Sequence, residues 1–396
     1  MATLIPKTSL LFLSLAALFA LPTTSLAQTY RDFLIVRNRE EPHRSLLQIR
    51  AGYRAVDSEG ENLNTGLVND AAVDGFILYH SSEVTAKQDW TLDIYAGLDG
   101  IYLGLKDDLS YGKKAQTRLE LFGRPKAFYR EGFYQKGKYV TTGQYEGRDY
   151  GLRITSAQEL DKGIILDLGA FGRSNEFDRN TQTRPDFIIP DDYYGYGASI
   201  AIEQNNVKLD RNLGLPQAGV LMTVMVEYEL INSKKQWGTP AYRTELPDGF
   251  YRADARVEFY VPNAKSGVWE ILADLGYYDS EDRVTSYHAE HMQGYIWGDG
   301  TLGYRMSLGE SFVFKPFAQL QYTKILDQNG VTSSEEFFWG GGINMALVFS
   351  QNMALVLEYS YVDNPSRDHA SLSDDFYGEH QLFFGMDVSF GSGYRR

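Results

Sequence analysis

Apolar and polar residues alternate with a period of two along most of this 396-residue chain. The alternation is clearest in residues 251–261, which read YRADARVEFYV. Successive side chains of a β-strand point to opposite faces, whereas a helix would distribute these charges around its surface. The pattern therefore predicts strands that have one apolar face and one polar face.

The repetition of this pattern between residues 45 and 390 predicts an all-β, antiparallel fold of about 16 strands, within a range of about 14 to 18. The strands are about ten residues long, which is enough to cross a bilayer at a tilt. Connections alternate between short and long, as in barrels that have turns at one mouth and loops at the other. Residues 205–217 are too long for this alternation and Asp99-Gly100 is too short. We therefore predict a transmembrane β-barrel.

The aromatic content, 28 Tyr and 22 Phe, is high for a chain whose mean hydropathy is −0.34. A barrel accounts for both values, because aromatic residues and charges occupy opposite faces of the same strands. Aromatic residues near strand ends are expected to form two girdles at the membrane interfaces: Tyr194, Tyr228, Tyr251, Trp269, Tyr277, Tyr322, Trp339 and Tyr361. The alternative is a secreted β-sandwich, which also alternates but has strands of about five or six residues.

The chain carries a net charge of −14 and contains no cysteine. The lack of cysteine excludes disulfide frameworks, thiolate metal sites and cysteine nucleophiles. The excess of 52 acidic over 38 basic residues argues against a nucleic-acid partner, which needs a basic surface. The sequence predicts no cofactor, no metal site and no catalytic residue.

The N-terminus has the pattern of an export signal. Lys7 precedes an apolar run from Leu10 to Leu21, and Ser25-Leu26-Ala27 forms a small-x-small cleavage site. The run is shorter than the ~20 residues that a spanning helix needs. We expect a cleaved signal peptide at 1–27, a lead-in or small plug at 28–44, the barrel at 45–390 and a short tail at 391–396.

The last predicted strand contains Gly385, Val388 and Phe390 in the order glycine, x, x, apolar, x, aromatic. It resembles the C-terminal targeting strand of bacterial outer-membrane β-barrels, and the whole chain resembles their porin-like type. The resemblance implies a bacterial outer-membrane location, contact with outer-membrane lipids and lipopolysaccharide, and recognition by the barrel assembly machinery. It also implies that the last strand closes against the first; porins of this type are often homotrimers. Six residues, GSGYRR, follow Phe390, whereas members of this family usually stop at the aromatic residue.

The polar faces of the strands are expected to line the interior. A barrel of about 16 strands leaves an aqueous channel, so we predict a porin-like channel for passive diffusion of small hydrophilic solutes. The expected pore-lining residues are Arg50, Arg54, Arg118, Glu227, Glu229, Arg252, Asp254, Arg256, Glu258 and Arg305. For any one of these charges, the alternative is a cross-strand ion pair that holds the wall together.

The connection 123–144 is basic within an acidic chain. Its five cationic residues, against the single acidic Glu131, are Arg124, Lys126, Arg130, Lys136 and Lys138. Rings of Lys and Arg select anions, so an inward fold of this third external loop would form a constriction for anions or sugars. The alternative is a solvated surface loop.

Two other functions are compatible with a barrel of this kind. A polysaccharide or other solute export barrel or receptor usually has a periplasmic repeat domain or a large plug, and residues 28–43 are too few for either. An outer-membrane lipid-modifying enzyme would need a site such as His288 and His291 near Ser286 and Glu290, but no G-x-S-x-G motif supports it. We therefore do not expect an enzyme.

Overall fold

The computed structural model describes most residues between 45 and 390. The gaps are 59–71, 83, 85–89, 98–99, 108–114, 125–129, 136–137, 162, 182, 210–214, 233–235, 241, 246–247, 264–266, 279–295, 310, 327–331, 351–352 and 363–375. The expected signal peptide, lead-in and C-terminal tail lie outside the described residues. Some strand residues, Arg54 and Phe390 among them, are described by their backbone only.

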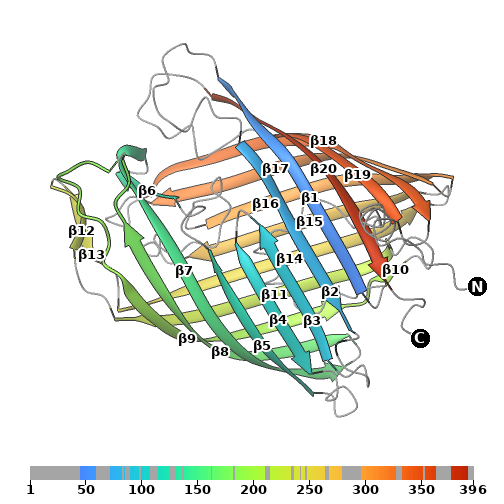
Figure 1. Ribbon diagram of the computed structural model, residues 1–396, viewed down its shortest axis with the longest axis horizontal. Helices are drawn as coiled ribbons and strands as arrows, with labels where there is room; N and C mark the ends of the chain where they lie inside the picture. Colours follow the sequence, from blue (N-terminus) through green and yellow to red (C-terminus); the bar gives the residue numbers. More distant parts are fainter. Residues whose placement is uncertain are drawn as a thin grey trace, which may run out of the picture.

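Sixteen strands form the wall of a closed antiparallel barrel (Figure 1). They are β1 (Ser45–Ser58), β2 (Ala72–Ser81), β3 (Trp90–Gly97), β4 (Ile101–Asp107), β5 (Ala115–Arg124), β7 (Lys138–Asp161), β8 (Ile164–Asp178), β9 (Tyr193–Asn205), β11 (Pro216–Ile231), β14 (Gly249–Asn263), β15 (Gly267–Tyr278), β16 (Ile296–Leu308), β17 (Phe312–Leu326), β18 (Thr332–Ser350), β19 (Met353–Val362) and β20 (Phe376–Phe390). Four short strands lie in the connections: β6 (Arg130–Gln135), β10 (Lys208–Leu209), β12 (Gln236–Thr239) and β13 (Tyr242–Glu245).

Closure of the barrel joins the first and last strands. β1 pairs with β20 from Ser45↔Phe390 to Ser58↔Phe376. The predicted fold class, the strand number of about 16 and the closure of the last strand on the first are confirmed. No helix among the described residues is long and apolar enough to cross a membrane.

The two faces of each strand differ as the alternation predicts. On β7, Ile154 is 55% exposed on the outer face, whereas its neighbour Arg153 is 0% exposed on the inner face. Aromatic residues pair across strands on the outer face: Tyr228 with Tyr251 near one end of the barrel, and Trp269 with Tyr304 near the other. The outer surface therefore offers lipid an apolar band with aromatic residues near both edges.

The two mouths differ in the lengths of their connections. Ser45 and Phe390 lie at one end, where β7, β16 and β18 also end and β8, β17 and β19 begin; we call it the short-turn mouth. β8 and β11 end at the other end, the long-loop mouth, where β9 and β14 begin. The two exceptions in connection length still join strand ends on the expected side: β3 ends and β4 begins at the long-loop mouth, whereas β9 ends and β11 begins at the short-turn mouth. The alternation of sides is thus complete, although connection length does not follow it everywhere.

Candidate functional site

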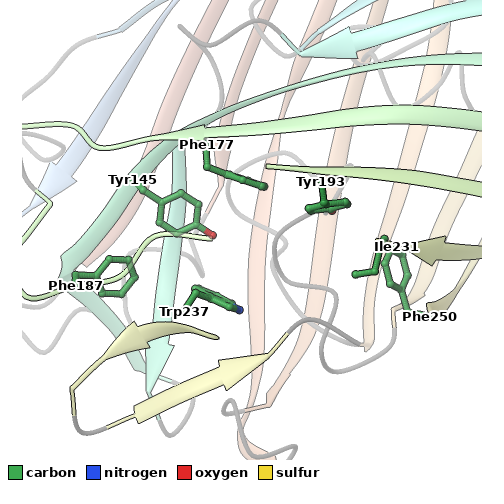
Figure 2. Packing of buried hydrophobic residues seen from close by; sticks show 7 residues of the cluster. All are labelled: Tyr145, Phe177, Phe187, Tyr193, Ile231, Trp237 and Phe250. Carbon is green, nitrogen blue, oxygen red and sulfur yellow. The ribbon is translucent and has the colours of Figure 1, made fainter. Parts of the chain in front are cut away.

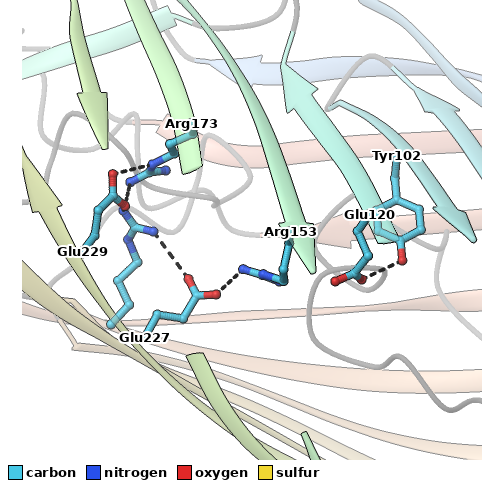
Figure 3. A network of polar contacts seen from close by, with 7 residues as sticks. Tyr102, Glu120, Arg153, Arg173, Glu227 and Glu229 are labelled. Atoms are coloured by element: carbon cyan, nitrogen blue, oxygen red, sulfur yellow. Dashed lines mark hydrogen bonds and ion pairs between the residues drawn. The ribbon is translucent and has the colours of Figure 1, made fainter. Parts of the chain in front are cut away.

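Five charged side chains meet on the inner wall and form what we call the lumen network: Arg153 of β7, Arg173 of β8, Glu227 and Glu229 of β11, and Arg252 of β14 (Figure 3). Arg153 pairs with Glu227. Arg252 Nη1 lies 3.5 Å from Glu227 Oε2, and its Nη2 donates to Glu229 Oε2 at 2.9 Å. Arg173 Nε donates to Glu229 Oε1 at 2.8 Å. The network therefore ties four strands together across the lumen face.

Inward-facing glycines make room for these long side chains. Gly195 lies beneath Glu229, where an added Cβ would approach Glu229 Oε1 to 1.7 Å. Gly197 lies beneath the Phe171 ring in the same way, and an added Cβ there would lie 2.6 Å from Phe171 Cζ. Because the wall is flat at these positions, charged chains from strands two or three apart can reach one another along its surface.

The lumen network is withdrawn from solvent. Each of its five residues is 3% exposed or less. The Arg153 guanidinium also lies 5.4 Å from the ring centres of both Phe122 and Phe171, so aromatic faces cover it. Buried charges are tolerated when they are paired in this way, and removal of one partner is costly.

The other predicted pore-lining residues lie on the same inner face. Arg50 pairs with Asp387, Arg118 with Asp167 at 3.0 Å, and Arg256 with Glu258 at 2.8 Å. All nine with described side chains are less than a tenth exposed; these are Arg50, Arg118, Glu227, Glu229, Arg252, Asp254, Arg256, Glu258 and Arg305. We expected them to face a water-filled channel, but in the described structure they are covered by one another and by neighbouring side chains. Their contact with a solute stays a prediction.

The predicted constriction segment is built differently from the expected loop. Arg124 is the last residue of β5, and its Nε donates to Asp149 Oδ1 of β7 at 2.8 Å, so it belongs to the wall. Residues 130–135 form β6 and pair with the start of β7 as a hairpin, from Arg130↔Glu146 to Gln135↔Lys138. The side chains of Arg130 and Lys138 are not described, and Lys126 and Lys136 lie outside the described residues.

An aromatic cluster lies instead against the inner face of five neighbouring strands at the long-loop mouth; we call it the aromatic cap, and Figure 2 shows it. Five members come from the inner face of wall strands near their ends: Tyr145, Phe177, Tyr193, Ile231 and Phe250. Phe187 comes from the connection 179–192 and Trp237 from β12. All seven are 6% exposed or less, and Tyr145 lies 6.2 Å from Phe187 and 6.1 Å from Trp237 between ring centres.

The two connections that carry Phe187 and Trp237 hold each other in place. Ile188 N donates to Gly238 O at 2.9 Å, and Gly238 N donates to Ile188 O at 2.8 Å. β12 and β13 form a hairpin with Trp237 opposite Thr244. The Arg179 guanidinium donates to backbone carbonyls within the first connection, including Arg184 O at 3.0 Å. The two loop-borne rings of the aromatic cap are therefore held by backbone hydrogen bonds between their connections and pack on the wall.

The short-turn mouth is narrowed by the end of the β9–β11 connection. Leu215 is 1% exposed and packs with Val313, Ala346 and Val356, which lie on the inner faces of β17, β18 and β19. Arg305 of β16 donates to Pro216 O, and its Nε donates to Glu270 Oε1 at 2.5 Å. Lys315 Nζ donates to the other oxygen of Glu270 at 3.0 Å. Leu215 and Pro216 therefore extend from β11 toward strands that lie three to six places around the wall.

Several sequence-based candidates remain without a test. Gly385 lies beneath Arg50, where an added Cβ would approach the Arg50 side chain to 2.2 Å, and Val388 is 4% exposed. Their role in targeting stays a prediction, as does that of Phe390. His288 and His291 lie outside the described residues. Among the residues described, no group of three or more His, Asp or Glu could hold a metal ion.

The aromatic cap was not predicted, although a signal for it exists in the sequence. Tyr145, Phe177 and Phe250 occupy positions that share the parity of Arg153, Arg173 and Arg252. An aromatic residue at the end of a strand face that lines a water-filled channel is unusual. The sequence places the aromatic residues at strand ends on the lipid face, so it does not predict an inward cluster there.

Comparison with solved structures finds the same fold. The crystal structure of BamA from Haemophilus ducreyi lacking POTRA domains 1–3 is 12% identical with a TM-score of 0.50, and the match covers 96% of this chain and 78% of that chain. CdiB from Acinetobacter baumannii is 9% identical with a TM-score of 0.49, covering 87% and 60%. The CymD monoaromatic hydrocarbon channel is 10% identical with a TM-score of 0.41, covering 89% and 90%.

No protein-family model matches the chain, and no curated protein does either. At 12% identity, the likeness to BamA shows the fold alone. The expectation of a bacterial outer-membrane type of β-barrel is confirmed.

Proposed function

We propose that this protein is an outer-membrane channel for small hydrophilic solutes, and that it is held closed in the state described by the structure. The observation that carries the proposal is the inner wall, which bears the charged lumen network inside a barrel whose outer face is apolar. A barrel that served only as a lipid-embedded scaffold would have no need of so many buried charges, each of which is costly to withdraw from water. A barrel of 16 strands is also wide enough to leave an aqueous path.

The expected preference for anions is weaker than the sequence suggested. Arg124, one of the five cationic residues of the segment 123–144, is paired with Asp149 in the wall. The solute class is therefore better argued from the described inner face than from this segment.

The second candidate is an export barrel or receptor that opens only on engaging a partner. The observation that favours it is the packing of connection residues on the inner wall at both mouths, in the aromatic cap and at Leu215. A permanently open porin would need neither contact.

Single-channel recording in planar bilayers tests the proposal. We expect the purified full-length protein to show discrete conductance steps, and Trp237→Ala to increase the open time, because this change removes a loop-borne ring from the cap. Blockade by a size series of neutral and charged solutes would then measure the width of the path. If neither the wild-type protein nor Trp237→Ala conducts ions, the diffusion channel is wrong and the partner-opened barrel takes its place.

A further inference from the structure

Asn175 is a buried polar residue at the junction between the lumen network and the aromatic cap. It lies on β8 between Arg173 and Phe177, which share its inner face. Its side chain is 1% exposed, and neither Oδ1 nor Nδ2 has a hydrogen-bond partner in the described structure. Burying an amide without partners is costly, and in native proteins such groups are usually met by ordered water or by a ligand.

A second polar group faces the same space. The sheet register places Asp149 of β7 and Tyr193 of β9 on either side of Asn175. Asp149 is 0% exposed; its Oδ1 accepts the hydrogen bond from Arg124 Nε, while its Oδ2 accepts none. Adjacent strands therefore present one amide donor and two acceptor oxygens side by side. The negative charge of Asp149 is balanced by Arg124, so this polar edge favours a neutral ligand over an ion.

The apolar part of the junction is aromatic. Phe177 and Tyr193 are stacked at an angle of 29° with ring centres 6.0 Å apart, and Tyr145 meets Phe177 edge to face at 5.8 Å. These three rings belong to the wall, whereas Phe187 and Trp237 reach it from the connections (Figure 2). The two loop-borne rings can therefore leave without breaking the barrel.

We propose that Asn175, Asp149, Phe177 and Tyr193 form a binding site for a neutral saccharide, and that Trp237 and Phe187 occupy the place of the sugar while the site is empty. Small-molecule sites typically combine aromatic walls with a few placed polar groups, as here. The C–H groups of a sugar ring pack on the negative faces of aromatic rings. Its hydroxyls both donate and accept, which matches the carboxamide of Asn175 and the open oxygen of Asp149. The site rests on the proposed channel function and names the solute class.

Calorimetric titration of the full-length protein in detergent with glucose and with maltose tests the site. We expect at least one sugar to bind, and Asn175→Leu to weaken that binding at least tenfold. Asn175→Leu should fold with an unchanged or raised Tm, because a side chain of similar size replaces an amide without partners.

Asn344→Leu is the matched control. Asn344 lies on the inner face of β18, and its Nδ2 also has no hydrogen-bond partner, but it is not part of the aromatic cap. We expect it to keep the wild-type affinity. If wild-type protein binds neither sugar, or if Asn175→Leu binds as tightly as wild type, the proposal is wrong; in the first case buried water is what satisfies Asn175.

The titration does not depend on ion flow, so it separates the two proposals. Sugar binding without conductance would keep the site and remove the diffusion channel. Conductance without sugar binding would keep the channel and remove the site.

Discussion

The two mouths of the barrel differ in the contacts that connection residues make with the wall. At the long-loop mouth, the aromatic rings of Phe187 and Trp237 pack on the ends of wall strands. At the short-turn mouth, Leu215 packs on β17, β18 and β19, and the adjacent Pro216 carbonyl accepts a hydrogen bond from Arg305, which Glu270 holds in turn. The comparison indicates that the first set of contacts joins loop to wall through aromatic packing and can be reversed locally, whereas the second is tied to the buried charges of the wall.

The largest effect should come from breaking the charged tie at the short-turn mouth. Glu270→Ala leaves Arg305 and Lys315 buried without their shared carboxylate, and we expect a loss of about 3–5 kcal/mol in the free energy of unfolding. Urea unfolding of the barrel in lipid vesicles measures this loss. Glu176→Ala is the control, because its pair with Arg148 is more than a third exposed on both sides and should contribute little to stability. Equal losses would show that charge does not hold this mouth.

Two tryptophans near the long-loop mouth allow the contribution of the wall to stability to be compared with that of the aromatic cap. Trp297 is 1% exposed on the inner face of β16, and Trp297→Ala should cost about 3–5 kcal/mol in global unfolding. Trp237 is 4% exposed, yet Trp237→Ala should cost less than about 1 kcal/mol globally, because its connection can detach while the barrel stays folded. Urea midpoints and amide exchange of β12 and β13 measure the two effects. A global loss in Trp237→Ala as large as that in Trp297→Ala would place the cap within the cooperative unit of the barrel.

The smallest difference is expected between two glycines near the short-turn mouth, Gly219 of β11 and Gly309 of the β16–β17 connection. Gly219 has φ of 119°, and a Cβ there would lie 2.6 Å from Asn206 O. We expect Gly219→Ala to cost about 2–3 kcal/mol from strain and contact together. Gly309 has φ of 72° with nothing within 4 Å of an added Cβ, so Gly309→Ala should cost only about 1 kcal/mol. Equal urea midpoints for the two variants would mean that the contact with Asn206 imposes no constraint.

The wall could be predicted from the sequence because each strand carries its own signal. Alternation reports which face meets lipid, and it requires no knowledge of what the other face contacts. Residues 251–261, for example, place Tyr251 on the outside at 55% exposure and Arg252 on the inside at 1%, as their pattern indicates. The number of alternating segments then predicts about 16 strands, as found.

The closures could not be predicted in the same way, because they depend on contacts between distant parts of the chain. Leu215 meets Val356, and Arg305 meets Pro216, at separations that no local pattern encodes. The sequence places Arg124 in a basic loop, because its partner Asp149 lies 25 residues further along the chain. Alternation distinguishes inside from outside, but it cannot tell a wet interior from one in which charges cover one another.

The seam between β1 and β20 also sets a limit on how fast the chain can become a barrel. Its fourteen residue pairs join the first and last strands of the wall, so they form the contacts of greatest sequence separation and the slowest to be found by search. Until they form, both strands carry a row of unpaired backbone groups, which are costly in hydrocarbon and adhesive toward any other strand. The rate-limiting step of folding is therefore expected at this seam, where a nearly complete sheet still has two free edges.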